Sequence, residues 1–144
     1  MSPILRNVLA VVAGFFLGSV VNMGIIMGGS TVIPLPAGVD VTSTESLKAS
    51  MHLFRPVHFV TPFLAHALGT LVGAMVTARL AATRKSRLAM VIGVAFLCGG
   101  VAGVFMLPAP AWFVALDLVG AYLPMGWLGG RLAAGPGAAA VESR

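Results

Sequence analysis

Four long apolar segments, separated by shorter polar stretches, dominate the pattern of this chain. They lie at about 4–29, 56–82, 88–107 and 111–132. About 20 apolar residues in a helix cross the hydrocarbon core of a bilayer, and in lipid the backbone polar groups have to be paired within the segment. The pattern therefore predicts an all-α integral membrane protein, with a bundle of four transmembrane helices formed by residues 1–134.

The connection between the first two segments, residues 30–55, is longer than the other connections. It begins with VIPLPAGVD, whose prolines and glycine disfavour a helix. Thr42 then precedes Glu45 by three residues, as in a capping box, and apolar residues recur at helical spacing. We expect a short amphipathic helix at about Ser43 to Phe54, lying on the outer membrane surface. A plain connector that packs well is the alternative.

The distribution of lysine and arginine predicts the orientation of the segments. Basic residues flank them on one side, at Arg6, Arg84, Lys85, Arg87 and Arg131. On the opposite side, the basic residues of the long loop are balanced by Asp40 and Glu45. The positive-inside rule then places both termini in the cytoplasm, and we expect the bacterial inner membrane. The last residues, 135–144, predict a disordered cytoplasmic tail.

Composition supports a membrane protein and argues against a nucleic-acid partner. The chain is 58% hydrophobic and 9% charged, whereas soluble domains are about 25% charged. The formal net charge is +5, but the basic residues sit at segment ends, where they attract anionic lipid headgroups. We therefore expect membrane lipids as partners and no nucleic acid. The single cysteine, Cys98, excludes an intrachain disulfide and a cysteine-based metal site.

Polar residues inside an apolar segment are costly in lipid, so each one is a candidate for a function. In the second segment, a helical count of 100° per residue places His58 and His66 on one third of the circumference. The same face carries Pro62, Gly69, Thr70, Gly73 and Thr77. In the first segment, a similar face carries Asn7, Gly14, Gly18 and Asn22. We expect the two segments to pack through these faces, because glycines four residues apart let helix backbones approach closely.

Asp117 is the only acidic residue within an apolar segment. At a rise of 1.5 Å per residue, Asn22, His66 and Asp117 lie at similar depths in the outer half of the membrane. We expect them to converge, with His66 as the partner of Asp117. Together with His58 they form a candidate ligand or proton site. The alternatives are a hydrogen-bonded plug that fixes helix register, a site shared with a partner protein, and no convergence.

A second group, Glu45, His52 and Arg55, forms a candidate cluster at the outer surface, whose simplest role is to cap a helix at the headgroup level. Metal binding has less support. His58 and His66 are about 12 Å apart along one helix axis, so they cannot ligate the same ion. A copper-like set would use the side chains of Met23, Met27, Met51, His52 or His58. Methionine is also an ordinary filler of apolar cores, and the sequence requires no cofactor and no metal.

These observations support three hypotheses for the function. The first is a binding or transport module for an ion, a proton or a small ligand, acting alone or as a homo-oligomer. The second is a structural or accessory subunit of a larger complex, with a membrane-protein partner. The third, a membrane enzyme with a site on the outer face, has the least support, because the sequence contains no recognisable nucleophile or metalloprotease motif.

Overall fold

The computed structural model describes residues 1–134, which contain helices and no strand. The helices are α1 (Pro3–Val32), α2 (Thr44–Ser50), η1 (Met51–Leu53), η2 (Pro56–Phe59), α3 (Val60–Leu80), α4 (Lys85–Met106), α5 (Ala111–Gly120) and α6 (Leu123–Ala134), with η denoting a 3-10 helix. The predicted disordered tail, 135–144, lies outside the described residues.

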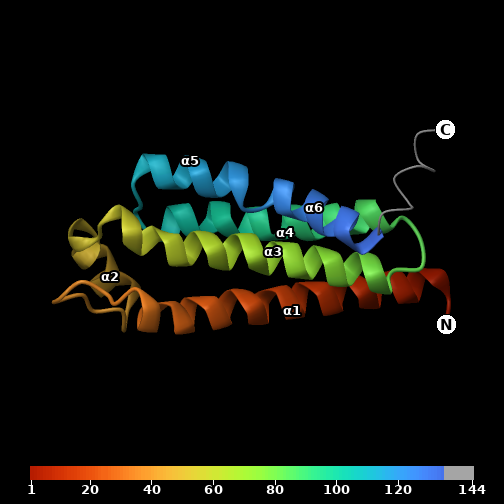
Figure 1. Ribbon diagram of the computed structural model, residues 1–144, viewed down its shortest axis with the longest axis horizontal. Coiled ribbons are helices and arrows are strands. Elements are labelled where there is room, and N and C mark those ends of the chain that lie inside the picture. Colours follow the sequence, from red (N-terminus) through yellow and green to blue (C-terminus); the bar gives the residue numbers. More distant parts are fainter. Residues whose placement is uncertain (135–144) are drawn as a thin grey trace.

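Four helical segments of the described chain are long and apolar enough to cross a membrane. This confirms the prediction of an all-helical chain with four candidate spans. They are Pro3–Val32, Pro56–Leu80, Lys85–Met106 and Ala111–Ala134. The long helices lie side by side along the long axis of the molecule (Figure 1). The N-terminus, the α3–α4 turn and the end of α6 lie at one end, which we call the terminal end. The opposite end, which holds the α1–α3 loop and the α4–α5 connection, is called the loop end.

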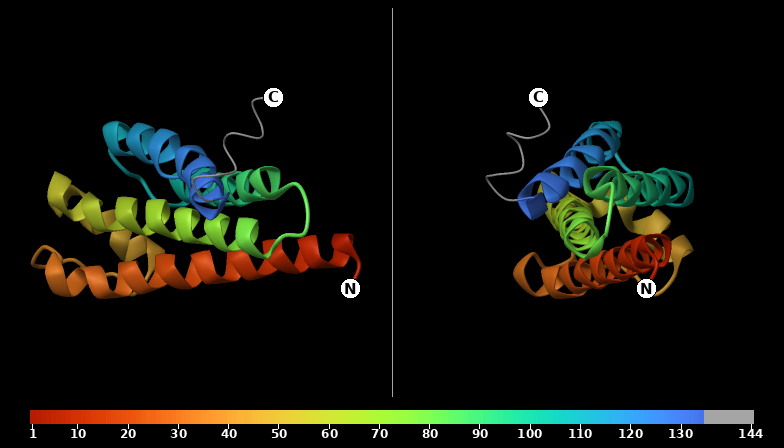
Figure 2. Two further views of the ribbon diagram at one scale, coloured as in Figure 1. Left: turned by 45° about the vertical axis from the view of Figure 1, so that its right-hand side comes forward. Right: turned by 90° about the vertical axis from the view of Figure 1, so that its right-hand side faces the viewer.

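Helix α3 is the centre of the bundle, because it packs against α1, α4 and α6. The end-on view in Figure 2 shows α3 between α1 on one side and α4 and α6 on the other. Its buried positions are small residues: Ala65, Ala67, Gly69, Thr70, Gly73, Ala74, Thr77 and Ala78. Small side chains let neighbouring backbones approach closely, so α3 can contact three helices at once.

The contact between α1 and α3 confirms the predicted packing of the two glycine faces. A Cβ built at Gly69 would lie 2.8 Å from the carbonyl oxygen of Gly18. A Cβ at Gly73 would lie 2.7 Å from the carbonyl oxygen of Gly14. One helical turn further along α3, the hydroxyl of Thr77 donates a hydrogen bond to the carbonyl oxygen of Ala10 at 3.2 Å. The two backbones are thus too close for any side chain at these glycines.

The start of α1 is tied to the turn after α3. Asn7 Oδ1 accepts hydrogen bonds from the backbone N–H groups of Ala82 at 2.9 Å and Thr83 at 3.2 Å. Arg6 Nε donates to the carbonyl oxygen of Leu80 at 2.8 Å. The last carbonyls of a helix have no hydrogen-bond donor within that helix. Arg6 of α1 therefore supplies a donor to a carbonyl at the end of α3. The sequence placed Asn7 on the packing face but did not reveal this role.

The fourth apolar segment, predicted as one span, is confirmed as a candidate span and consists of two consecutive helices. Helix α5 ends at Gly120 and α6 begins at Leu123. Pro124 has no N–H to donate to the carbonyl of Gly120, and this removes a hydrogen bond that a continuous helix needs. After the interruption, the carbonyl of Tyr122 accepts a hydrogen bond from the N–H of Gly126 at 2.8 Å. This bond begins the new helix α6.

The short helix of the long loop is present, as predicted, and consists of α2 followed by η1. The assignment of Thr42 as its capping residue is wrong, because the N-cap is Ser43, whose hydroxyl accepts the N–H of Ser46 at 3.0 Å. Thr42 donates its hydroxyl and its N–H to Asp40 Oδ1, at 2.6 and 2.8 Å. These hydrogen bonds hold the pKa of Asp40 below its ordinary value. Because Thr42 is hydrogen-bonded to Asp40 in the preceding turn, the N-cap of α2 is the next residue, Ser43.

Candidate functional site

The structure brings together two of the predicted site residues, His66 of α3 and Asp117 of α5. His66 Nδ1 lies 2.8 Å from Asp117 Oδ1 and 2.9 Å from Oδ2. The side chain of Asp117 is 7% exposed and that of His66 is 28% exposed. An ionised carboxylate can only accept hydrogen bonds, so with Asp117 ionised the donor of this pair is Nδ1 of His66. The buried acid therefore has a partner, as a charge in a low-dielectric interior requires.

Tyr122 completes this group, and the sequence analysis missed it. Its hydroxyl donates a hydrogen bond of 2.9 Å to Asp117 Oδ2. Its ring stacks on the imidazole of His66, with the centroids 5.7 Å apart and the planes at 28°. Two features of the sequence could have pointed to Tyr122. It is the only tyrosine of the chain, and it lies two residues before Pro124, inside an apolar segment.

The break between α5 and α6 is what positions Tyr122. Helix α5 closes with the N–H of Ala121 on the carbonyl of Asp117, at 2.9 Å. The chain then turns inward, so that Ala121 and Tyr122 are buried at 0% and 1% exposure. On α4, Gly100 makes room for the phenol, since a Cβ there would lie 2.5 Å from the Tyr122 hydroxyl oxygen. Three helices thus hold the carboxylate and its two donors in one geometry.

The second ring nitrogen of His66, Nε2, takes no part in these contacts. Within residues 1–134 it has no hydrogen-bond partner, and no side-chain polar atom there is both buried and unpaired. Nε2 is therefore not sealed inside the bundle. When Nδ1 donates to a carboxylate, the neutral imidazole presents a lone pair at Nε2, and the carboxylate stabilises the imidazolium that forms when Nε2 takes up a proton.

The other two predicted members, Asn22 and His58, lie outside this pair. No hydrogen bond in the described part of the chain joins Asn22 to His66 or Asp117. Its Cβ instead packs on α3, 3.0 Å from a Cβ built at Gly69. His58 Nδ1 accepts the N–H of Arg55 at 2.9 Å, which caps η2 at the loop end. Similar depth along the helices did not bring Asn22 to the pair, and His58 lies eight residues before His66, nearer the loop end.

The predicted outer-loop cluster is spread along the α2–η2 region. Glu45 is exposed in the first turn of α2. His52 Nδ1 lies 2.9 Å from the carbonyl oxygen of Ala49, and the backbone of Arg55 donates to His58. Over residues 1–134, no ion pair or hydrogen bond joins Glu45, His52 and Arg55. The structure thus adds no catalytic arrangement at this face.

A metal centre gains no support from the described residues either. They contain no group of three or more His, Cys, Asp or Glu side chains that could hold an ion. Two of the methionines considered for copper, Met23 and Met27, are 56% and 70% exposed on α1. Such exposure is ordinary for apolar residues on the outer face of a candidate membrane span.

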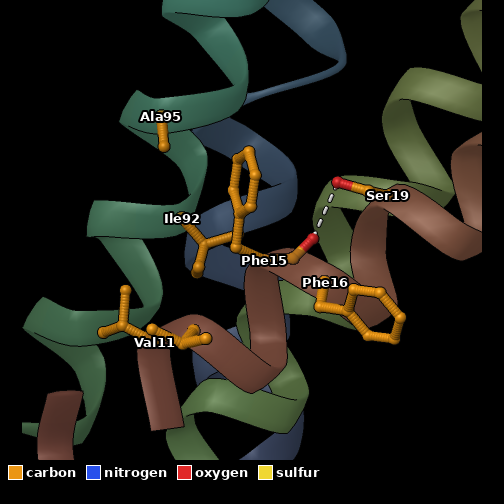
Figure 3. A pocket seen from close by; sticks show the side chains of 7 residues that line it. Val11, Phe15, Phe16, Ser19, Ile92 and Ala95 are labelled. Atoms are coloured by element: carbon orange, nitrogen blue, oxygen red, sulfur yellow. Dashed lines mark hydrogen bonds between the residues drawn. The ribbon is translucent and has the colours of Figure 1, made fainter. Parts of the chain in front are cut away.

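Two apolar grooves lie on the surface of the bundle, and neither includes His66. The larger, of about 480 Å³, lies between α1 and α4 (Figure 3). Its one polar lining residue, Ser19, donates its hydroxyl to the carbonyl of Phe15 at 2.8 Å. The smaller, of about 120 Å³, lies between α3 with η2 and α5 near the loop end. Both present apolar side chains, as a groove facing lipid would.

Comparisons with protein-family models, with curated proteins and with solved structures found no match for this chain.

Proposed function

We propose that this chain is an integral membrane protein that takes up and releases a proton at His66, as part of a transport or binding cycle. The observation that carries the proposal is the His66–Asp117 pair, with Nδ1 held at 2.8 Å and Nε2 open. In this proposal the helices span a bacterial inner membrane, with the terminal end and both chain termini on the cytoplasmic side, where basic residues concentrate.

The position of the pair along the bundle supports a role in the membrane interior. His66 lies ten residues after Pro56, the first residue of η2, which corresponds to about 15 Å along a helix. That is about half of a 30 Å hydrocarbon core. Ionisable groups at such a depth are costly in lipid, and they are most often found on proton or substrate pathways.

The chemistry of the group suits reversible proton binding. Nε2 accepts a proton with its lone pair, and the positive charge that forms lies directly against Asp117. The hydroxyl of Tyr122 already bonds Oδ2, so the carboxylate stays oriented in both states. The pair therefore alternates between net negative and net neutral without moving a helix.

Proton uptake is tested with His66→Asn in liposomes that contain a pH-sensitive dye. The amide nitrogen of asparagine reproduces the Nδ1 donor toward Asp117, whereas the position of Nε2 is lost. We expect acidification of the lumen after an external acid pulse to be slower by roughly tenfold or more, since a positioned acid–base group contributes at least that order to proton transfer.

The matched control is His52→Gln, because His52 is exposed and its one side-chain hydrogen bond within residues 1–134 is with the carbonyl of Ala49. This variant should retain the rate of the original protein. A His66→Asn protein with unchanged helicity and an unchanged acidification rate would contradict the proposal and favour the plug, in which the pair serves only to fix helix register.

An accessory or assembly subunit is the second candidate function, supported by unoccupied glycines on the outside of the bundle. Nothing lies within 4 Å of a Cβ built at Gly24 and Gly28 of α1, or at Gly99 and Gly103 of α4. Both pairs are four residues apart, the spacing at which helices associate in membranes. A membrane-protein partner or a second copy of this chain would pack there.

Native mass spectrometry after gentle extraction tests the accessory role. We expect a mass above the 14.7 kDa of one chain, which Gly28→Leu reduces to that of one chain because the leucine blocks close helix approach. Val20→Leu, at a position already exposed and apolar, is the matched control. A mass of one chain in the original protein would rule this role out.

A further inference from the structure

Basic side chains from two distant segments meet where the start of α1 lies against the turn between α3 and α4. Arg6 Nε donates to the carbonyl oxygen of Leu80 at 2.8 Å, one residue after Arg79. Asn7 bonds the hydroxyl of Thr83 at 2.9 Å and its N–H at 3.2 Å. The α3–α4 turn lies at the terminal end of the bundle (Figure 1). We call the exposed cations of this region the basic corner: Arg6, Arg79, Arg84, Lys85 and Arg87.

No acid neutralises the basic corner within the part of the chain that the structure describes. Asp40 and Glu45 belong to the long loop at the opposite end. Asp117 is paired with His66, and this is the only ion pair among residues 1–134. Like charges that the fold holds together repel one another, and a bound anion offsets that repulsion. The basic corner is therefore complementary to an anion.

The backbone of Arg84 is consistent with a use for its charge. Arg84 directly precedes α4 and has the left-handed conformation, with φ 51° and ψ 38°. Among residues 1–134 it is the only residue other than glycine with a positive φ. Glycine and asparagine adopt this conformation more readily than residues with long side chains. An arginine is thus conformationally unfavourable here, and what it adds to the turn is a cation.

Exposed leucines beside the corner favour a lipid over a soluble anion. Leu5 and Leu80, the sequence neighbours of Arg6 and Arg79, are 50% and 47% exposed. Each lies near the terminal end of a candidate span. A soluble polyanion would neutralise the cations and leave these side chains in water. An anionic lipid brings a phosphate to the cations and hydrocarbon to the leucines.

We propose that the basic corner is a specific binding site for the headgroup phosphate of an anionic glycerophospholipid. Cations from the start of α1 and from the α3–α4 turn bind the same headgroup, because the bonds of Arg6 and Asn7 hold these two segments together. Basic residues scattered along the membrane surface would attract anionic lipids only collectively. The proposal rests on membrane insertion, and it is independent of proton binding at His66.

Native mass spectrometry tests the site on protein kept in micelles with equimolar phosphatidylglycerol and phosphatidylcholine. We expect the original protein to retain mainly phosphatidylglycerol. The double variant Arg84→Asn, Lys85→Gln should lower the ratio of the two adducts roughly tenfold or more, because each basic residue near the surface contributes about fivefold to anionic lipid binding. Asparagine is chosen at position 84 because it tolerates the left-handed conformation. The matched control, Lys48→Gln, Arg55→Gln, removes two exposed charges at the loop end and should leave the ratio unchanged.

Arg6→Gln tests whether α1 contributes to the same site as the α3–α4 turn. We expect the adduct ratio to fall about fivefold, with helicity by circular dichroism unchanged, whereas Arg55→Gln leaves the ratio as it is. An unchanged ratio in a folded Arg6→Gln protein would overturn the convergence of the two segments on one headgroup.

Three other results would also overturn the proposal. The first is an original protein without preference for phosphatidylglycerol. The second is an equal loss of preference in the two double variants, which would mean that net charge alone attracts the lipid. The third is a pyrophosphate adduct, formed in micelles with phosphatidylcholine alone, that is retained as strongly as phosphatidylglycerol. None of these results depends on the acidification rate, so this proposal and that of proton binding fail separately.

Discussion

Gly73→Leu should destabilise the bundle by about 3 kcal/mol, at the upper end of what overpacking costs. The new Cβ alone would lie 2.7 Å from the carbonyl oxygen of Gly14 and 3.2 Å from Cγ2 of Ile92. The first of these neighbours is backbone, and the second is a side chain with 0% exposure, so neither can move aside cheaply. Helix α1 would have to separate from α3, which is its main contact. Unfolding by titration with a denaturing detergent measures the loss.

Val20→Leu is the control for this prediction. It enlarges a side chain of α1 that is apolar and 51% exposed. We expect its stability to stay within about 0.5 kcal/mol of the original protein, as for substitutions away from packed sites. Equal losses for Gly73→Leu and Val20→Leu would show that the glycine contact of α1 and α3 contributes no specific stability.

Asp117→Leu should cost about 2 kcal/mol, most of it from the hydroxyl group that it leaves without an acceptor. Individual hydrogen bonds between membrane helices average about 0.6 kcal/mol, so losing the His66 bond alone has a small effect. Tyr122 differs because it is 1% exposed, and an unsatisfied buried donor costs about 1–3 kcal/mol. His66 is less affected, since its partly exposed side chain can find another partner.

The double variant Asp117→Leu, Tyr122→Phe separates these two contributions. Removing the hydroxyl together with its acceptor should restore about 1 kcal/mol relative to Asp117→Leu alone. Tyr122→Phe by itself should be mild, because Asp117 keeps both contacts with His66. The measurement is again the free energy of unfolding in a detergent titration. Losses that simply add across the cycle would mean that Tyr122 and Asp117 are not coupled.

The candidate site was predictable only in part from the sequence. His66 and Asp117 stood out because imidazole and carboxylate groups are costly in apolar segments, and their similar depth made a contact plausible. Asn22 met the same criteria, yet its Cβ packs on α3 at Gly69, because depth does not specify the direction of a side chain. Tyr122 was not singled out, because its side chain is largely apolar and the sequence does not reveal the acceptor of its hydroxyl group.

The elements were predictable from the sequence alone: four apolar helical segments, the long loop with its short helix, and the glycine faces of α1 and α3. Each follows from local chemistry, namely apolar length, capping residues and the absence of side chains at fixed helical spacing. Tertiary structure decided the rest. The break at Pro124 turns Tyr122 inward only because Gly100 of α4 leaves room for it. The tie between Asn7 and the α3–α4 turn likewise depends on how far α1 is shifted along α3. That shift is set by packing between residues distant in the sequence.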